Sequence, residues 1–542
     1  MPILTGDDLI EAGWQSGPEI GKALKVASEY EARGITDRKY LLKLIAKQVP
    51  KSNPKISLRS ADDHAPLTEA IEATCDADAK NIGAVRRHME ELLRTPVIER
   101  GSIMPDACPA GSALGTIPVG GAIAVKNAII PNAHSADICC SMYATFFRSG
   151  KDVSELMDDL EGSTRFGWGG RHEKPLETPK PNRDEVIVPH DIVDEEVWGN
   201  PFLSGLQNHA RIHIADQGDG NHFAFLGRVE FNKEQLTALA QSGQAELANA
   251  LRASSVENDS VTTLALVTHH GSRGLGAQVF KRGQKAAEKH THKVAKGVPK
   301  PAMWIDYDTD AGHDYWEALE YVGRWTKANH QSIHARFLER SEATHIADFG
   351  NEHNFVWKQG DTFLHGKGAT PAWLDDDGHP LLGLIPLNMA APILMVLGSD
   401  NADYLSFCPH GAGRNVSRTA TMRPFMNKDG TLDEEAIARE IARTTKDIEA
   451  RWWHGKPDLS ECPIGYKSAD QVKAQIAQFN LADIVAEIQP LGSIMAGDPG
   501  TPPWKRRKEE LTPKQLRQIE HRAERRKTRQ RLGDDWREIE KY

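Results

Sequence analysis

Short apolar runs that end in glycine-rich loops dominate the sequence from Gly101 to about residue 497. Three examples are GTIPVGGAIAV, AIIPNAHSADICCSMYATFF and VTTLALVTHHGSRGLG, at 115–125, 128–147 and 261–276. Such runs are typical of buried strands whose connecting loops carry the polar residues. More charged, helix-prone stretches lie near 314–342 and 433–451, and no period of 20 to 50 residues repeats, which argues against a solenoid or propeller. We therefore expect a mixed α/β (α+β) fold with one large body.

The pattern divides the chain into three parts. Residues 1–100 are predicted to be a helical N-terminal extension, with helices after Pro18, after Asp37 and over 67–93. Residues 101–497 form the predicted large α/β body. Residues 498–542 are predicted to be a basic, charged helical tail, because 501–542 holds 14 Lys and Arg against 8 Asp and Glu. A solvated helix is the simple interpretation of this tail, and an arm that contacts RNA or the ribosome is the alternative.

Composition excludes several classes of protein. The 542 residues are 39% hydrophobic and 26% charged, with a net charge of −10, as in globular domains. No run reaches the roughly 18 apolar residues that a membrane helix needs, and the start of the chain lacks the pattern of a secretory signal. Six cysteines are too few for a disulfide scaffold. We expect a cytoplasmic protein with no membrane partner.

Several of the 22 histidines lie in glycine-rich loops, where backbone and ligand can approach closely. Asp137 and Cys140 lie three residues apart after a predicted strand, and a carboxylate with a thiolate can hold a transition ion, the thiolate bridging two. His222, His269 and His353 come from separate loops. A single histidine is more often structural than a ligand, but five such donors suffice for two Mn²⁺ or Zn²⁺ ions with open positions for substrate oxygens.

Two further loops suggest phosphate binding. The loops 271–274 (Gly-Ser-Arg-Gly) and 411–414 (Gly-Ala-Gly-Arg) each combine a permissive backbone with an arginine suited to phosphate oxygens. His410 directly precedes the second loop, which makes it a candidate covalent nucleophile; the alternative is a loop histidine that bonds to its own turn. His290 and His292, in KHTHKVAKG, are interpreted as part of a solvated basic loop.

The ordered motifs DICC, GNHF, HHGSRGLG, EHNF, HGKGAT and HGAGR resemble those of the RtcB family of RNA-splicing ligases, over roughly residues 100 to 497. The resemblance implies an RtcB-like fold that joins RNA 2′,3′-cyclic phosphate or 3′-phosphate ends to 5′-hydroxyl ends with GTP and Mn²⁺. It implies that His410 becomes guanylylated and that Cys140 bridges the ions. The implied metal ligands are Asp137, Cys140, His222, His269 and His353, and the implied nucleotide contacts are Asn221, Ser399, His410, Gly411, Ala412, Gly413 and Arg414.

Four positions depart from the family pattern. Phe225 stands where the family usually has an acidic residue, and Ala496 stands where it has a lysine, both implied to read the guanine base. Gly366 replaces a usual arginine and Cys108 a usual histidine. Base recognition depends on paired polar groups. We therefore expect recognition by stacking or shape at Phe225, which would accept a nucleotide other than GTP.

Two other functions remain open from the sequence. A metal-dependent phosphoesterase would open cyclic phosphates or trim RNA ends without a nucleotide and without His410. A non-catalytic RNA- or ribosome-binding protein would use the basic tail, although such a module has no need of the five candidate ligands. The physiological RNA, the need for an archease-like activator and the oligomeric state are likewise left open.

Overall fold

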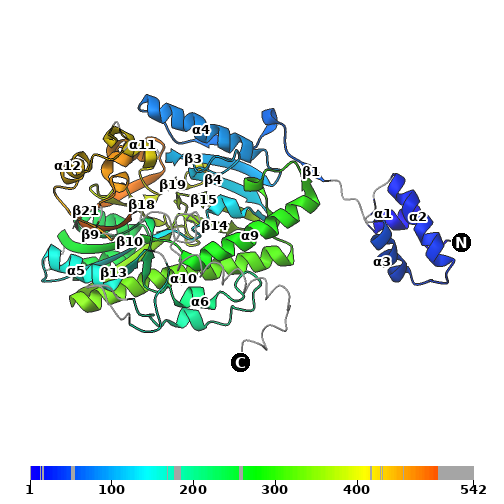
Figure 1. The fold of residues 1–542 in the computed structure, drawn as a ribbon, viewed down its shortest axis with the longest axis horizontal. Helices are drawn as coiled ribbons and strands as arrows, with labels where there is room; N and C mark the ends of the chain where they lie inside the picture. The colour runs from blue at the N-terminus through cyan, green and yellow to red at the C-terminus, as the bar shows by residue number, and fades with distance from the viewer. Residues whose placement is uncertain are drawn as a thin grey trace.

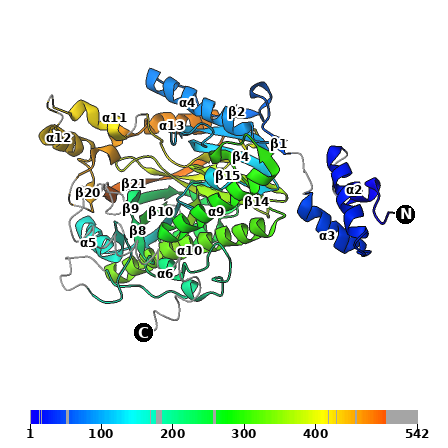
Figure 2. The ribbon, with the colours of Figure 1, turned by 45° about the vertical axis from the view of Figure 1, so that its right-hand side comes forward.

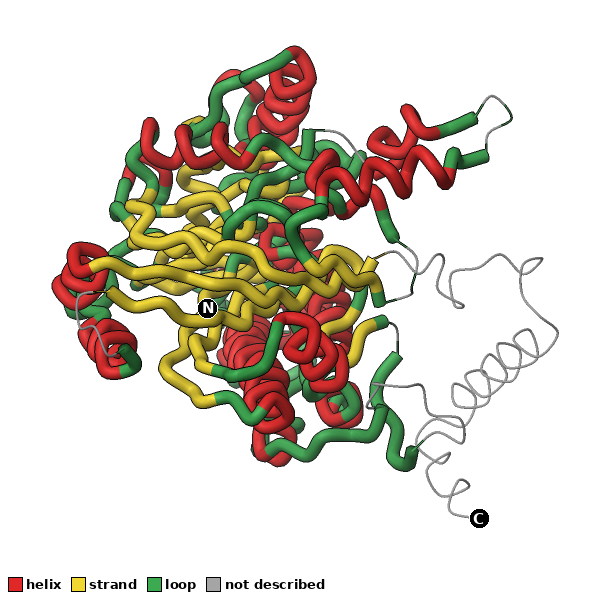
Figure 3. Tube along the Cα trace, turned by 90° about the vertical axis from the view of Figure 1, so that its left-hand side faces the viewer, coloured by secondary structure: helices red, strands yellow, loops and turns green. Residues whose placement is uncertain are grey.

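The computed structural model describes residues 2–497 except 13, 15, 16, 50–54, 168, 176–184, 256–259, 416, 417, 428, 430, 454 and 456. The predicted tail after residue 497 therefore lies outside the described residues. Helices and strands are mixed throughout the described chain, which confirms the predicted α/β (α+β) class. Strands fill the middle of the molecule, and helices lie on its outer sides (Figure 3).

The larger sheet contains eight strands, and it positions most of the predicted ligands. Its order is β13-β6-β10-β9-β21-β18-β17, all antiparallel, with β20 pairing parallel to β21. Figure 1 labels β13, β10, β9, β21 and β18 of this sheet. The strands are β6 (Ser141–Arg148), β9 (Gly220–Asn232), β10 (Ser260–His270), β13 (Thr344–Glu352), β17 (Leu382–Pro386), β18 (Ile393–Gly398), β20 (Glu449–Trp452) and β21 (Ala482–Gly497).

Both faces of the larger sheet are buried, which explains its continuous apolar runs. Side chains alternate between the two faces of a strand. Phe146 thus packs with α7 (Lys233–Gln241) and α8 (Ala245–Ala253) on one face. Its neighbour Phe147 packs on the other face with α5 (Val153–Ser163) and the 32-residue helix α10 (Asp310–Ser341).

A second sheet and several short strand pairs complete the body. The second sheet has the order β14-β15-β4-β3-β2. Its strands are β2 (Leu67–Glu69), β3 (Ile98–Cys108), β4 (Val119–Lys126), β14 (Asn354–Gln359) and β15 (Thr362–Lys367). The pairs are β1 (Ile56–Ser57) with β11 (Ala295–Lys296), β5 (Ala128–Ile129) with β12 (Ile305–Asp306), β7 (Arg165–Phe166) with β8 (Asp216–Gly218) and β16 (Ala369–Pro371) with β19 (Phe407–Pro409). The other helices of the body are α4 (Asp76–Leu93), α6 (Gln207–Arg211), α9 (Arg273–Val294), α11 (Arg418–Met422), α12 (Glu434–Thr444) and α13 (Ala469–Gln478).

The first three helices form a separate unit with a core of its own. They are α1 (Gly6–Glu11), α2 (Pro18–Glu31) and α3 (Arg38–Gln48), so the two helices predicted after Pro18 and Asp37 are confirmed. Leu9, Trp14 and Leu41 are among the side chains that fill this core. Figures 1 and 2 show the unit set apart from the rest of the described chain. No described helix is long and apolar enough to cross a membrane.

Two local predictions were wrong. The helix predicted over 67–93 is the strand β2 followed by the shorter helix α4, because Leu67–Glu69 pairs in parallel with β3. The segment with His290 and His292 belongs to α9 and not to a loop. The domain limits at residues 100 and 497 stay predictions.

Candidate metal centre and active-site cavity

The predicted metal ligands come from one end of four neighbouring strands. Cys140 immediately precedes β6, His222 lies at the start of β9, His269 near the end of β10, and His353 follows β13. These strands are adjacent and antiparallel, so the starts of β6 and β9 meet the ends of β10 and β13 at the same edge. Asp137 is in the turn before Cys140. The fold therefore brings together all five side chains.

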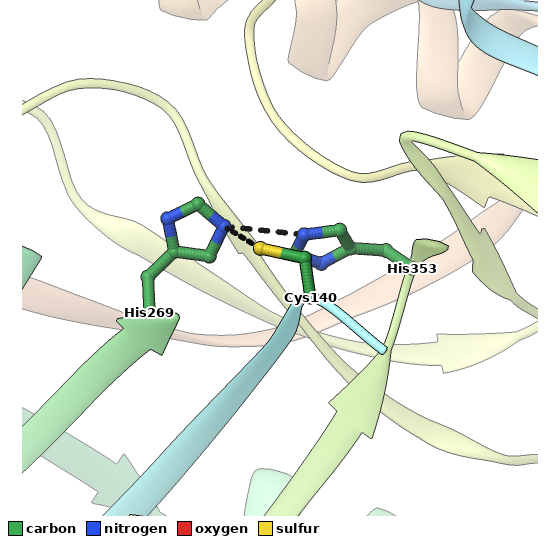
Figure 4. A group of neighbouring side chains, drawn as sticks. All are labelled: Cys140, His269 and His353. Carbon is green, nitrogen blue, oxygen red and sulfur yellow. Dashed lines mark hydrogen bonds between the residues drawn. The ribbon is translucent and has the colours of Figure 1, made fainter. Parts of the chain in front are cut away.

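The ligand atoms form two groups that share one sulfur. Cys140, His269 and His353 are one group, and Asp137, Cys140 and His222 are the other. The Cys140 Sγ lies 3.1 Å from His269 Nε2 and 3.8 Å from His222 Nε2. His269 Nε2 is 3.2 Å from His353 Nε2, and His222 Nε2 is 2.9 Å from an Asp137 oxygen. Figure 4 shows the side chains of the first group pointing toward one another.

These separations suit coordination of a cation. Nitrogen and sulfur ligands at about 2.0–2.3 Å from a tetrahedral ion lie roughly 3.3–3.8 Å apart. The ligand oxygen, nitrogen and sulfur atoms lie within 4.8 Å of one another in each group. Cys140 belongs to both groups, so the two sets of candidate ligands share its sulfur.

The surroundings of His269 and His353 leave their imidazoles neutral. Burial and the neighbouring His222 lower the pKa of His269 to about 3. Burial and His410 lower the pKa of His353 well below its ordinary value. His269 Nδ1 donates to the Asn221 carbonyl oxygen at 3.3 Å, so its Nε2 keeps a lone pair directed at Cys140. Neutral imidazole is the form that binds metals.

The acid and the thiol in the centre have opposite pKa shifts. Burial raises the pKa of the Asp137 carboxyl, but the adjacent His222, together with Arg273 and His269, outweighs this and holds the pKa at about 2. Burial and the Asp137 charge raise the pKa of the Cys140 thiol well above its ordinary value. The thiol therefore keeps its proton until a cation displaces it. Gly271 permits this packing, since a Cβ there would lie 2.2 Å from an Asp137 oxygen.

A cavity of about 320 Å³ connects the metal centre with His410. The predicted residues Asp137, Cys140, Asn221, His269, His353 and His410 line it, as do Gly411, Ala412, Gly413 and Arg414. Arg414 is held in the wall by Glu461, whose carboxylate lies 3.0 Å from the guanidinium, and by the hydroxyl of Tyr466 at 3.2 Å. Ser399 is not among the lining residues, so the structure does not bring it to the site.

His410 is held by Asp106, a residue that the sequence analysis missed. The fully buried carboxylate of Asp106 accepts from His410 Nδ1 at 2.5 Å and from the His410 backbone N–H at 3.2 Å. A carboxylate only accepts hydrogen bonds, so Nδ1 carries the proton and Nε2 keeps its lone pair. The pairing of β3 with β4 is irregular between Ile103 and Cys108, the part of β3 that holds Asp106. Gly413 lets the loop approach, because a Cβ there would lie 2.0 Å from the Asp106 carbonyl oxygen.

On the expectation that His410 is a covalent nucleophile, replacing Asp106 with asparagine should slow its reaction by about 10²- to 10⁴-fold. The change preserves the shape of the side chain but removes the charge that fixes the Nδ1–H form and stabilises the reacting imidazole. The rate of adduct formation on His410, followed by intact mass, is the measurement. Metal content is the control, because Asp106 belongs to neither ligand group, and an unchanged rate would contradict the role of Asp106.

Comparison with known proteins agrees with this geometry. The family model described as "tRNA-splicing ligase RtcB" matches residues 88–496. RNA-splicing ligase RtcB2 of Escherichia coli ATCC 25922 is 30% identical over 357 residues, covering 64% of this chain and 82% of the relative. RNA-splicing ligase RtcB of E. coli K12 is 24% identical over 414 residues, covering 71% and 87%. tRNA-splicing ligase RtcB of Thermococcus kodakarensis is 24% identical over 439 residues, covering 69% and 84%. The chain therefore belongs to the RtcB family.

Proposed function

We propose that this protein is an RNA ligase that joins 2′,3′-cyclic phosphate or 3′-phosphate ends to 5′-hydroxyl ends through a nucleotide adduct on His410. The observation that carries the proposal is that His410, fixed by Asp106, lines one cavity together with four of the five candidate metal ligands, Asp137, Cys140, His269 and His353. A phosphoesterase would also need the cluster, but it would use an oriented imidazole as a general acid or base and would form no nucleotide adduct. Family membership supports the same activity.

The first step is transfer of a nucleotide to His410. The Nε2 lone pair attacks the α-phosphorus of GTP, a P–N bond forms, and the bond to pyrophosphate breaks. The imidazole proton stays on Nδ1, where Asp106 stabilises the positive charge that develops on the ring. Arg414 lines the same cavity and offers a guanidinium to the phosphate oxygens.

The adduct then activates the RNA end. An oxygen of the RNA 3′-phosphate attacks the adduct phosphorus, and the P–N bond breaks to release His410. The 5′-hydroxyl of the second RNA next attacks the 3′-phosphorus, GMP leaves, and the hydroxyl proton passes to solvent. A cyclic phosphate first adds water to become a 3′-phosphate. Activation is needed because a bare phosphate oxygen is a poor leaving group.

We propose two Mn²⁺ ions as the resident metals, with Zn²⁺ as the alternative. His269 and His353 would hold one ion and Asp137 and His222 the other, with Cys140 between them. The donor set of imidazole, thiolate and carboxylate suits transition ions better than Mg²⁺ or Ca²⁺. When bound, such ions neutralise phosphate charge and increase the acidity of water and hydroxyl groups.

The nucleotide is proposed to be GTP or another nucleoside triphosphate whose base is recognised by shape. Beyond the ligand cluster the cavity lining is mixed. It includes the polar side chains of Asn354, Lys367, Asn388, Glu461 and Ser493, and an apolar wall formed by Phe223, Phe225, Leu387, Met389, Ile393 and Met495. Phe225 is buried in the sheet core, and Ala496 is buried next to the lining residue Met495. An apolar wall favours stacking and does not pair with the polar edge of one particular base.

Intact mass spectrometry after incubation with Mn²⁺ and each of the four nucleoside triphosphates tests this function. We expect an acid-labile nucleotide adduct on the wild type, with comparable yields from at least two nucleotides because the apolar wall discriminates weakly. A strict preference for GTP would contradict recognition by shape. Absence of an adduct with all four nucleotides, in protein shown to hold metal, would favour the phosphoesterase.

Location and partners complete the proposal. All six cysteines are free, which supports a reducing cytoplasm as the place of work. The RNA substrate has broken ends with a 2′,3′-cyclic phosphate or 3′-phosphate and a 5′-hydroxyl. An archease-like activator and contact of the basic tail with tRNA or the ribosome stay predictions.

A further inference from the structure

A row of four lysines runs along α9, the helix that begins beside the metal centre. Lys281, Lys285, Lys289 and Lys293 follow one another at intervals of four residues, and all four are exposed. Side chains four residues apart lie on the same face of an α-helix. The buried face of α9 carries Leu275, Val279, Gly283, Ala287 and Thr291 at the same spacing. We call the four lysines the α9 ridge; Figures 1 and 2 show its helix beside α10.

The ridge concentrates positive charge on an acidic protein. Residues 273–300 contain eight Lys and Arg and one acidic residue, Glu288, whereas the whole chain has a net charge of −10. Glu288 lies 3.8 Å from Lys300, which is outside the ridge. Among the residues that the structure describes, no ion pair involves a ridge lysine. The charge of the ridge is therefore available to an anionic partner.

The helix that carries the ridge begins at the rim of the metal centre. Arg273, the first residue of α9, lies 3.2 Å from His222 Nδ1 and 3.2 Å from an Asp219 carboxylate oxygen. The Asp137 and Asp219 side chains are 34% and 40% exposed, so the centre meets solvent at this rim. At 1.5 Å per helical residue, the ridge begins about 12 Å from Arg273 and ends about 30 Å from it.

We propose that the α9 ridge binds the phosphate backbone of the RNA substrate and leads the strand to the metal centre. This inference rests on the proposed action of the protein on RNA ends. A row of evenly spaced cations suits a polyanion with regularly repeated phosphates, and about 30 Å accommodates roughly nine stacked nucleotides at 3.4 Å each. A protein partner is less well suited, because α9, which is described throughout, exposes no large apolar side chain.

Fluorescence anisotropy with RNA of two lengths tests the ridge. The variant is K285Q/K289Q/K293Q, and the probes are a 20-nucleotide RNA with a 3′-phosphate and a tetranucleotide with the same end, used as a competitor. Four stacked nucleotides span about 14 Å, short of the roughly 18 Å that separates Arg273 from Lys285. We expect the variant to bind the 20-nucleotide RNA about ten-fold more weakly, and the negative slope of log K against log salt to decrease in magnitude by about 2. Binding of the tetranucleotide should be unchanged.

The chain supplies a matched control in its first three helices. Lys39, Lys43 and Lys47 on α3 have the same spacing and are also exposed, but they lie in the separate N-terminal unit. K39Q/K43Q/K47Q removes the same charge, and we expect it to bind the longer RNA like the wild type. If both variants bind the longer RNA equally weakly, or if the α9 variant binds it like the wild type, the proposal that the ridge binds RNA is wrong. Failure of the wild type to bind either RNA would instead overturn the proposed function.

Discussion

Replacing His410 with alanine should abolish the nucleotide adduct and lower RNA joining by at least about 10⁴-fold. Removing a covalent nucleophile eliminates its pathway, and the surrounding binding groups then provide only a small residual rate. His410 is the proposed nucleophile because Asp106 fixes its Nδ1–H and leaves Nε2 in the cavity. Adduct formation by intact mass and joining of labelled RNA ends by gel electrophoresis are the two measurements.

The control for this variant is His379→Ala. His379 is a surface histidine whose side chain is 44% exposed and which does not line the cavity. Its replacement should leave both adduct and joining unchanged. If the alanine variant of His410 still converts RNA ends at the wild-type rate, the adduct is not on the pathway. Conversion that also needs no nucleotide would identify the protein as the metal-dependent phosphoesterase.

The metal ligands could be predicted from sequence because each lies within two residues of a glycine or another ligand-type residue, near one end of an apolar run. His222 follows Gly220-Asn221, and His269 precedes His270-Gly271. The spacing of these residues along the chain could not show that their side chains meet at one place. That depends on four neighbouring antiparallel strands that reach the same edge of the sheet, and their order of pairing does not follow the sequence.

Asp106 could not be identified in the same way. Its partner His410 lies 304 residues further along the chain, and no local pattern distinguishes a carboxylate that orients a histidine from any other aspartate. Only the irregular pairing of β3 and the approach of the loop at Gly413 bring the two together. Ser399 is the opposite case. The family resemblance implies that it contacts the nucleotide, but it does not line the cavity.

The sequence contains enough information to predict the helix α9, although the segment with His290 and His292 was interpreted as a loop. Leu275, Val279, Ala287 and Thr291 lie on one four-residue spacing, which predicts a buried helical stripe and places the histidines of KHTHKVAKG on a helix. The error over 67–93 has a different cause. The three residues of β2 form a strand because they pair in parallel with β3. Such a tertiary contact overrides the local preference of the sequence for a helix.

Replacing Cys140 with alanine should remove both metal ions, whereas replacing His353 should remove one. Cys140 Sγ belongs to both ligand groups, and His353 belongs only to the group with His269. Loss of the shared thiolate should weaken both sites by at least about 100-fold, given that even outer contacts of a metal site are worth 10- to 100-fold. Metal content after dialysis against a defined Mn²⁺ concentration, measured by inductively coupled plasma mass spectrometry, counts the ions.

Cys139→Ala is the matched control, since this buried thiol is adjacent in sequence but lies in neither ligand group. Its sulfur lies against α10, 3.7 Å from where a Cβ on Gly323 would lie. A ligand that binds only the folded state at 100 times its Kd stabilises it by about 2.7 kcal/mol. Mn²⁺ should therefore raise the Tm of the wild type and of Cys139→Ala but not that of Cys140→Ala. Retention of two ions by Cys140→Ala would exclude the bridging sulfur, and loss of one ion would place Cys140 in a single site.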